Sequence, residues 1–127
     1  MKKLLIVDDS PELLEAMEFF LSRQGYRTKT LTNTHNIFDE IKNLEPDLII
    51  LDVFIGGTDG REVCKKLRKN SISKYLCVIL FSASANAIAD YEFHGADGCI
   101  EKPFSLTHML KEIERVLHKC KDHQPVI

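Results

Sequence analysis

The chain has 127 residues, enough for one domain that buries a core without disulfides or structural metals. A hydrophobic content of 44% and a charged content of 28% are typical of a globular protein, and a formal net charge of -2 excludes the basic surface of a non-specific nucleic-acid binder. The apolar run that follows Met1-Lys2-Lys3 is too short for a transmembrane helix or a signal peptide, so we expect neither.

Short apolar runs alternate five times with segments of helical periodicity. The runs predict strands at 4–7, 26–31, 48–51, 76–81 and 98–101. The predicted helices are one from Pro11 to Gly25, one over 34–44, one after Asp59, one over 86–93 and one after the capping residue Ser105. Ser10 is a good N-cap for the first of them, and Asp59 with Glu62 resembles a capping box for the third.

Five strand-helix units with short connections predict a parallel sheet with helices on both faces. The first strand is apolar and should be central, whereas 26–31 is more polar and should lie at an edge. We therefore predict an α/β, flavodoxin-like (βα)5 three-layer sandwich with strand order 2-1-3-4-5. The domain is expected to cover residues 1–121, with 122–127 as a tail or the start of a linker.

The four cysteines, Cys64, Cys77, Cys99 and Cys120, lie far apart in the sequence and form no CxxC pair. Cys77 is flanked by apolar residues, which is typical of a small core residue. We therefore expect neither a zinc site nor a disulfide framework. The cytoplasm is the expected compartment, because it keeps thiols reduced.

Polar residues stand where four of the predicted strands end. These residues are Asp8, Asp9, Asp52, Ser82 and Lys102. Because the carboxyl ends of parallel strands share one edge of the sheet, their side chains should converge there. Taken singly, each has a structural explanation, as a helix-terminal acid, a turn residue or a surface lysine. Their convergence favours a functional site.

Three carboxylates in one cleft repel each other unless their pKa values rise or a hard cation joins them. Oxygen ligands of this kind suit Mg²⁺, which often binds a phosphoryl oxygen as well. A carboxylate next to Mg²⁺ and an ammonium group can attack phosphorus and form an acyl phosphate. Asp52, which directly follows the buried run 48–51, is the candidate nucleophile.

These motifs are ordered and spaced as in the receiver domains of two-component response regulators, which the chain resembles over residues 3 to about 120. The matching segments are Asp8-Asp9, Asp52 with Asp59-Gly60, Ser82-Ala83, Gly95-Ala96-Asp97 and Lys102-Pro103-Phe104. The resemblance implies a phosphorylation-controlled switch and not an enzyme, although the domain would catalyse its own phosphorylation and dephosphorylation. It also implies a cis peptide between Lys102 and Pro103.

The resemblance assigns a role to each site residue. It makes Asp52 the phosphoacceptor, Ser82 the switch hydroxyl and Lys102 the contact to the phosphoryl group. Mg²⁺ would be held by Asp9 directly, by Asp8 mostly through water, by Asp52, and by the backbone carbonyl of Phe54.

The implied partners are a sensor histidine kinase or histidine phosphotransfer protein and an unknown output partner or missing effector domain. The output face would comprise the fourth helix, fifth strand and fifth helix, which could also form a homodimer. Neither direct nucleic-acid binding nor membrane binding is expected.

The sequence departs from the usual receiver pattern at three places. Gly56 stands where proline is usual and should loosen the loop after Asp52. Cys99 replaces the common aromatic switch residue, so the output face would signal by backbone shifts. Phe54 is bulky and Ser84 small where the family tunes water access, and we hypothesise that Phe54 shields an acyl phosphate.

Two alternatives remain from the sequence. A small Mg²⁺-dependent aspartyl phosphatase would normally have a general acid two residues after the nucleophile, and Phe54 cannot serve as one. A pseudo-receiver that acts only as an interaction module is also possible, although the intact set of acids argues against it.

Overall fold

The computed structural model describes residues 1–120, so the predicted tail at 122–127 lies outside the described residues. In chain order the elements are β1 (Lys3–Val7), α1 (Pro11–Arg23), β2 (Arg27–Leu31), α2 (Ile37–Leu44), β3 (Leu48–Asp52), β4 (Phe54–Ile55), β5 (Thr58–Asp59), α3 (Gly60–Lys69), β6 (Cys77–Ser82), α4 (Ala85–Ile88), the 3-10 helix η1 (Tyr91–His94), β7 (Gly98–Glu101) and α5 (Leu106–Cys120).

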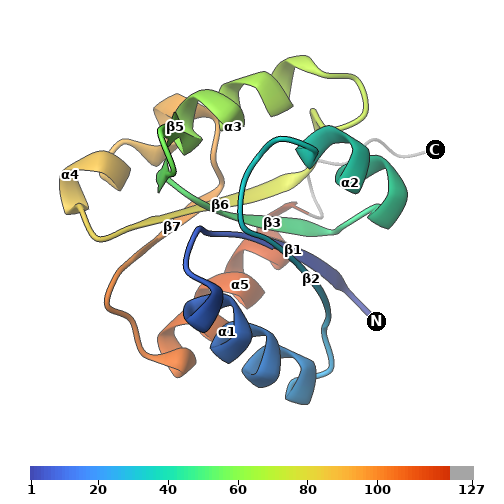
Figure 1. The fold of residues 1–127 in the computed structure, drawn as a ribbon, viewed down its shortest axis with the longest axis vertical. Helices are drawn as coiled ribbons and strands as arrows, with labels where there is room; N and C mark the ends of the chain where they lie inside the picture. Colours follow the sequence, from blue (N-terminus) through green and yellow to red (C-terminus); the bar gives the residue numbers. More distant parts are fainter. Residues whose placement is uncertain (121–127) are drawn as a thin grey trace.

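A five-stranded parallel sheet in the order β2-β1-β3-β6-β7 forms the middle layer. Helices α1 and α5 cover one face, and α2, α3 and α4 cover the other (Figure 1). The sequence's third, fourth and fifth strands are therefore β3, β6 and β7. The predicted flavodoxin-like order 2-1-3-4-5 is confirmed, with the polar strand β2 at an edge.

The central strands bury both of their faces, which explains their continuous apolar sequences. In β3, Leu48 and Ile50 belong to the core under α1 and α5, whereas Ile49 and Leu51 belong to the core under α2 and α3. All five residues of β3, including its last residue Asp52, are buried. The strand therefore carries an ionisable group to the end of a fully apolar segment.

Several predicted helix ends are confirmed. The Ser10 hydroxyl accepts a hydrogen bond from the Leu13 N–H at 3.3 Å, and Gly25 follows the helix with a φ of 93°. Asp59 caps α3 by accepting from the Arg61 N–H at 2.9 Å. The capping-box part of that prediction is wrong, because the Glu62 carboxylate pairs with Lys65 at 3.5 Å.

Two helices differ from their predicted bounds. Helix α2 begins at Ile37 rather than at 34, because a turn precedes it in which the Ile37 N–H donates to the Thr34 carbonyl. The predicted helix over 86–93 is divided into α4 and η1. Its weakly amphipathic sequence did not reveal this break, and Gly95 ends the segment with a φ of 90°.

The structure joins Cys77 to Cys120 in a disulfide, and their Cα atoms lie 6.0 Å apart. The sequence analysis expected no disulfide framework, and for this one pair of cysteines that expectation is wrong. Spacing along the chain did not reveal the pair, because the two residues are separated by 43 positions and meet only when α5 packs on the sheet. Cys64 and Cys99 are free thiols.

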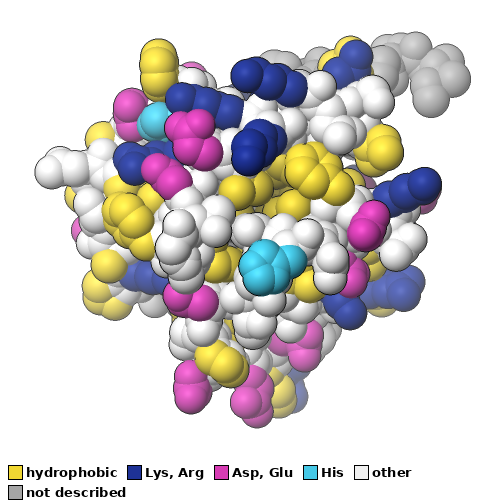
Figure 2. All heavy atoms as spheres, turned by 45° about the horizontal axis from the view of Figure 1, so that its top comes forward, with side chains coloured by type: hydrophobic (Ala, Val, Ile, Leu, Met, Phe, Trp, Pro, Cys, Tyr) yellow, Lys and Arg dark blue, Asp and Glu magenta, His cyan; other side chains and the backbone are white. Residues whose placement is uncertain are grey.

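The surface has a mixed charge. Figure 2 shows the face that forms the top of Figure 1, where Lys and Arg side chains lie next to acidic ones. On α3, Lys66 and Lys69 are exposed as the helical periodicity predicts. Among residues 1–120, the helices are all too short or too polar to cross a membrane.

Candidate functional site at the carboxyl edge of the sheet

The register of the sheet brings the predicted site residues to one edge. Strands β1 and β3 pair with Val7 beside Leu51, so the aspartates that follow these two residues emerge side by side. On the other side of β3, Asp52 lies opposite Phe81, the residue before Ser82. Lys102 follows directly after β7, the next strand.

Asp8, Asp9 and Asp52 form an acidic cluster, with one oxygen atom from each carboxylate within 4.8 Å of the others. Asp8 and Asp52 are 0% and 5% exposed, whereas Asp9 faces solvent. The loop after β1 holds the cluster in place, because the Ser10 N–H donates to Asp8 Oδ1 at 2.8 Å. The predicted convergence of the three carboxylates is confirmed.

Lys102 is the cation of this cluster. Its Nζ lies 2.7 Å from Asp8 Oδ2 and 3.6 Å from Asp52 Oδ2, and its ammonium group lies 4.5 Å from the centroid of the Phe81 ring. The Lys102–Pro103 peptide is cis, as the family resemblance implied. Lys102 therefore offsets part of the negative charge of two buried carboxylates.

Ionisation of the Asp52 carboxyl group remains unfavourable despite the nearby Lys102 ammonium. The pKa of Asp52 is raised from 3.8 to about 6, first by burial and then by the Asp8 carboxylate. Lys102 and a hydrogen bond from the Phe54 backbone lower the pKa but do not cancel these effects. An ionised Asp52 is thus a poorly solvated carboxylate, which an additional cation would stabilise.

The donor set fits Mg²⁺. All the clustered side chains offer carboxylate oxygens, which are the ligands that this hard cation prefers. One member is exposed, so a bound ion could keep several water molecules, as Mg²⁺ usually does. The unfavourable ionisation of Asp52 supplies a physical reason for a cation to bind here.

Ser82 ends β6 and is 1% exposed. Its hydroxyl oxygen accepts a hydrogen bond from the Ser84 N–H at 3.0 Å, and its carbonyl accepts from the Lys102 N–H at 2.8 Å. The second bond ties the end of β6 to the residue that contacts the acids. The structure thus places Ser82 on the predicted edge and links it to Lys102 through the backbone.

A small hairpin of β4 and β5 follows Asp52, and the sequence did not predict it. Its two turn residues, Gly56 and Gly57, have φ values of 45° and 46°, as two-residue hairpin turns require. The Gly56 N–H also donates to Asp9 Oδ2 at 3.2 Å. Proline could supply neither this φ nor this donor, so Gly56 does not merely loosen the loop: it shapes the turn and helps to hold Asp9.

Gly60 belongs to the Asp59-Gly60 motif of the sequence, but sequence reasoning did not show why glycine is needed there. A Cβ atom at this position would collide with the backbone carbonyl oxygen of Asp52, so only glycine permits this close approach of α3 to the end of β3. The Gly60 N–H donates to the Val53 carbonyl at 2.7 Å. The Asp59-Gly60 motif therefore fixes the segment that follows Asp52.

Comparison with known proteins agrees with this geometry. Residues 4–114 match the family model described as the response regulator receiver domain. Among solved structures, the chain is similar to a response regulator from Chloroflexus aurantiacus, with 27% identity, a TM-score of 0.85, and coverage of 92% of this chain and 98% of that one. It is also similar to the chemotaxis response regulator CheY4 of Vibrio cholerae, with 28% identity, a TM-score of 0.82, and coverage of 91% and 98%.

A third similar structure is larger. NtrX from Brucella abortus is 26% identical with a TM-score of 0.85, and the match covers 95% of this chain but 28% of that one. The fold described here thus occurs both in chains of about this length and as one part of a longer chain.

Proposed function

The chain belongs to the response regulator receiver domain family, and we propose that it is a phosphorylation-controlled switch with Asp52 as the phosphoacceptor. The observation that carries this proposal is the buried Asp52 carboxylate, which lies beside the carboxylates of Asp8 and Asp9 and 3.6 Å from the Lys102 ammonium. A buried carboxylate with a raised pKa at the end of a strand is costly to maintain, and a reaction at this group explains why it is there.

The proposed donor is a phosphohistidine of a sensor histidine kinase or a histidine phosphotransfer protein. An Asp52 carboxylate oxygen attacks phosphorus, so an O–P bond forms while the P–N bond breaks. The imidazole leaves with the bonding electron pair and takes up a proton. Lys102 then contacts a phosphoryl oxygen, and the Ser82 hydroxyl donates to another.

Mg²⁺, bound by Asp8, Asp9, Asp52 and the Phe54 carbonyl, would supply positive charge to the phosphoryl oxygens. The chain's own contribution is to hold the carboxylates. The Ser10 N–H donates to Asp8 and the Gly56 N–H donates to Asp9, so backbone groups of the chain orient two carboxylates of the acidic cluster. We propose the cytoplasm as the compartment of this exchange.

Phosphorylation would act on the output face through Ser82 and Lys102. The backbone hydrogen bond between them joins β6 to β7, which lies beside α4 and α5 on the proposed output face. A cavity of about 400 Å³ next to Cys99 lies on this face, where many family members have an aromatic residue. An effector domain, a separate partner or a second copy would read the change here.

The test is phosphorylation by a small phosphodonor. Incubation with Mg²⁺ and acetyl phosphate should add the mass of one phosphoryl group to the intact wild-type chain, and Asp52→Asn should abolish this addition. Asp47→Asn is the matched control, because Asp47 lies at the opposite end of β3 and should leave labelling unchanged.

The other outcomes would contradict the proposal or favour one of the two alternative functions. Labelling of Asp52→Asn at the wild-type level would contradict Asp52 as the phosphoacceptor. Continuous release of phosphate without stable labelling would favour the aspartyl phosphatase, and an unlabelled wild-type chain would favour the pseudo-receiver.

The lifetime of the acyl phosphate provides a second prediction. Phe54, in β4, is 58% exposed, and the Arg61 guanidinium in the first turn of α3 lies 5.9 Å from the centroid of its ring. Phe54→Asn should accelerate dephosphorylation several-fold, because a small polar side chain admits water beside Asp52. The loss of label over time measures this rate. Phe19→Asn, at an exposed phenylalanine of α1, is the control, and an unchanged or slower rate in Phe54→Asn would refute the shielding.

A further inference from the structure

Cys77 and Cys120 lie far from the carboxyl edge, at the other end of the sheet. Cys77 is the first residue of β6, and Cys120 is the last residue of α5. Both are nearly fully buried, at 1% and 3% exposed, and their Cα separation of 6.0 Å lies within the range of protein disulfides. Their bond joins the start of a central strand to the end of the last described helix.

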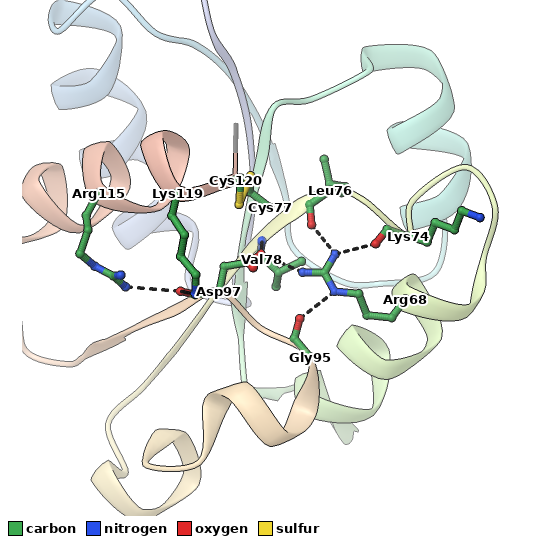
Figure 3. A network of polar contacts seen from close by, with 10 residues as sticks. All are labelled: Arg68, Lys74, Leu76, Cys77, Val78, Gly95, Asp97, Arg115, Lys119 and Cys120. Atoms are coloured by element: carbon green, nitrogen blue, oxygen red, sulfur yellow. Dashed lines mark hydrogen bonds and ion pairs between the residues drawn. A yellow bond between two sulfur atoms is a disulfide. The ribbon is translucent and has the colours of Figure 1, made fainter. Parts of the chain in front are cut away.

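The same junction is also held by non-covalent bonds around Asp97 (Figure 3). The Asp97 carboxylate accepts from the Val78 N–H at 3.0 Å and from Arg68 at 2.8 Å. Its backbone carbonyl accepts from Arg115 and Lys119 of α5, each at 3.3 Å. Helix α5 can therefore stay docked without the disulfide, so the two thiols would remain neighbours after reduction.

A metal ion is the other ligand that this cluster could hold. Cys77, Asp97 and Cys120 each offer a ligand atom within 4.8 Å of the others. However, Asp97 Oδ2 already accepts from Arg68 and from a backbone N–H, and the Lys119 ammonium lies next to the same residue. Two nearby cations and an occupied carboxylate oppose a cation here, whereas a disulfide adds no charge.

The pair has a route to small reagents. A cavity of about 270 Å³ adjoins Cys120 and is lined further by Arg68, Lys74, Tyr75, Leu76 and Asp97. Cys120 also lies in the last turn of its helix, where opening costs little. Cys64 and Cys99 are free thiols, and burial raises the pKa of both, to about 11 for Cys64.

We propose that Cys77 and Cys120 form a redox-controlled clasp, a dithiol that a hydroperoxide oxidises to the disulfide and that a cellular thiol reduces. One thiolate attacks a peroxide oxygen, which gives a sulfenic acid and releases the other oxygen as water once protonated. The second thiolate attacks the sulfenic sulfur, the S–S bond forms, and hydroxide leaves and becomes water with the remaining proton. Two thiols and one hydrogen peroxide thus yield one disulfide and two waters.

The Cys77–Cys120 disulfide links the two ends of the segment 77–120 into a loop, and this loop contains both Ser82 and Lys102. Oxidation therefore restricts the unfolded chain over a separation of 43 residues and prevents the end of α5 from leaving the sheet. In the reduced form, α5 is held by the bonds to Asp97 and by its apolar face. The inference concerns this junction alone and does not depend on phosphorylation of Asp52.

The experiment compares the reduced chain with the chain after hydrogen peroxide treatment. Each sample is denatured, alkylated with N-ethylmaleimide and weighed intact, and proteolytic peptides locate any cross-link. The reduced chain should take up four maleimides and the oxidised chain two, with Cys77 linked to Cys120. The oxidised chain should melt higher by on the order of 10 °C.

Cys120→Ala and Cys77→Ala should each abolish the link and the difference in melting temperature. Cys120→Ala is the more informative of the two, because its site lies in the last turn of α5 and not in a central strand. Cys99→Ala is the matched control and should retain both effects.

Four alkylated thiols after peroxide treatment, a link to Cys64 or Cys99, or equal melting temperatures would overturn the proposal. Stoichiometric binding of Zn²⁺ supplied alone, with protection of Cys77 and Cys120 from alkylation, would overturn it in favour of a metal site.

Discussion

Replacing Asp52 by asparagine is expected to stabilise the folded protein by about 2–3 kcal/mol at pH 7 in the absence of divalent cations. The pKa of Asp52 is raised from 3.8 to about 6, first by burial and then by the Asp8 carboxylate. A carboxyl group that binds its proton more tightly in the folded state makes stability fall as the pH rises from about 4 to 6, and the full cost persists above pH 6. Asparagine has nearly the same shape and carries no charge, so it removes this cost.

The measurement is urea denaturation of wild type and Asp52→Asn between pH 3.5 and pH 8, with chelator present. The advantage of the variant should be near its maximum at pH 7 and vanish below pH 4, where the wild-type carboxyl is protonated in both states. Equal stability of the two proteins at pH 7, or an advantage that persists at pH 3.5, would contradict this account of Asp52.

Asp59→Asn is the matched control because its expected effect has the opposite sign. The side-chain hydrogen bond from Arg61 lowers the pKa of Asp59, so this carboxylate stabilises the folded state above its unfolded pKa and loses that effect as the pH falls. Asp59→Asn should therefore be less stable than wild type at pH 7 and approach it in acid. Together the two variants distinguish an aspartate whose charge lowers the stability of the fold, as expected at a reactive site, from one whose charge raises it.

The sheet and the site could be predicted because their signals are local or repeat along the chain. Apolar runs such as 48–51 indicate buried strands, and the parallel topology brings the carboxyl ends of these strands to one edge of the sheet regardless of the conformation of the loops. Asp8, Asp52 and Lys102 could thus be assigned to one cluster without knowing any distance. The polarity of β2 likewise placed it at an edge, since only one of its sides is covered by a strand.

The features that escaped prediction depend on contacts across the fold. A hairpin of two-residue strands is too short for a periodic pattern. Gly56 was therefore expected only to make the loop flexible, and its positive φ and the hydrogen bond from its N–H to Asp9 were not predicted. The need for glycine at position 60 arises only where α3 meets the Asp52 carbonyl. The Cys77–Cys120 pair requires the whole of α5 to dock before its two members are close.

Replacing Lys102 by methionine is expected to destabilise the protein by about 3 kcal/mol at pH 7. The side chains of Asp8 and Asp52 are 1% and 7% exposed, and Lys102 is the ammonium group that lies within 4 Å of both. Methionine fills a similar volume without a charge, so it leaves two buried carboxylates uncompensated. The pKa of Asp52 should also rise above about 6, because Lys102 lowers it in the wild type.

Urea denaturation measures the first effect, and a ¹³C NMR titration of the Asp52 carboxyl measures the second. The loss of stability should shrink as the pH falls and the carboxyl groups become protonated. Lys102→Arg retains the charge and should lose much less stability, whereas Lys66→Met removes an exposed charge and should have little effect. An equal loss in all three variants would contradict a charge-specific role for Lys102.

The double variant Lys102→Met with Asp52→Asn identifies the carboxylate through which Lys102 acts. Lys102 Nζ is closer to Asp8 than to Asp52, at 2.7 Å against 3.6 Å, so most of its stabilising effect should remain when Asp52 is neutral. Its contact with Asp52 should still give a coupling energy on the order of 1 kcal/mol between the two sites. Lys102→Met could instead cost the same free energy of unfolding in the wild type and in Asp52→Asn. That result would mean that Lys102 does not interact with Asp52. The proposed contact between Lys102 and an acyl phosphate at Asp52 would then lose its structural basis.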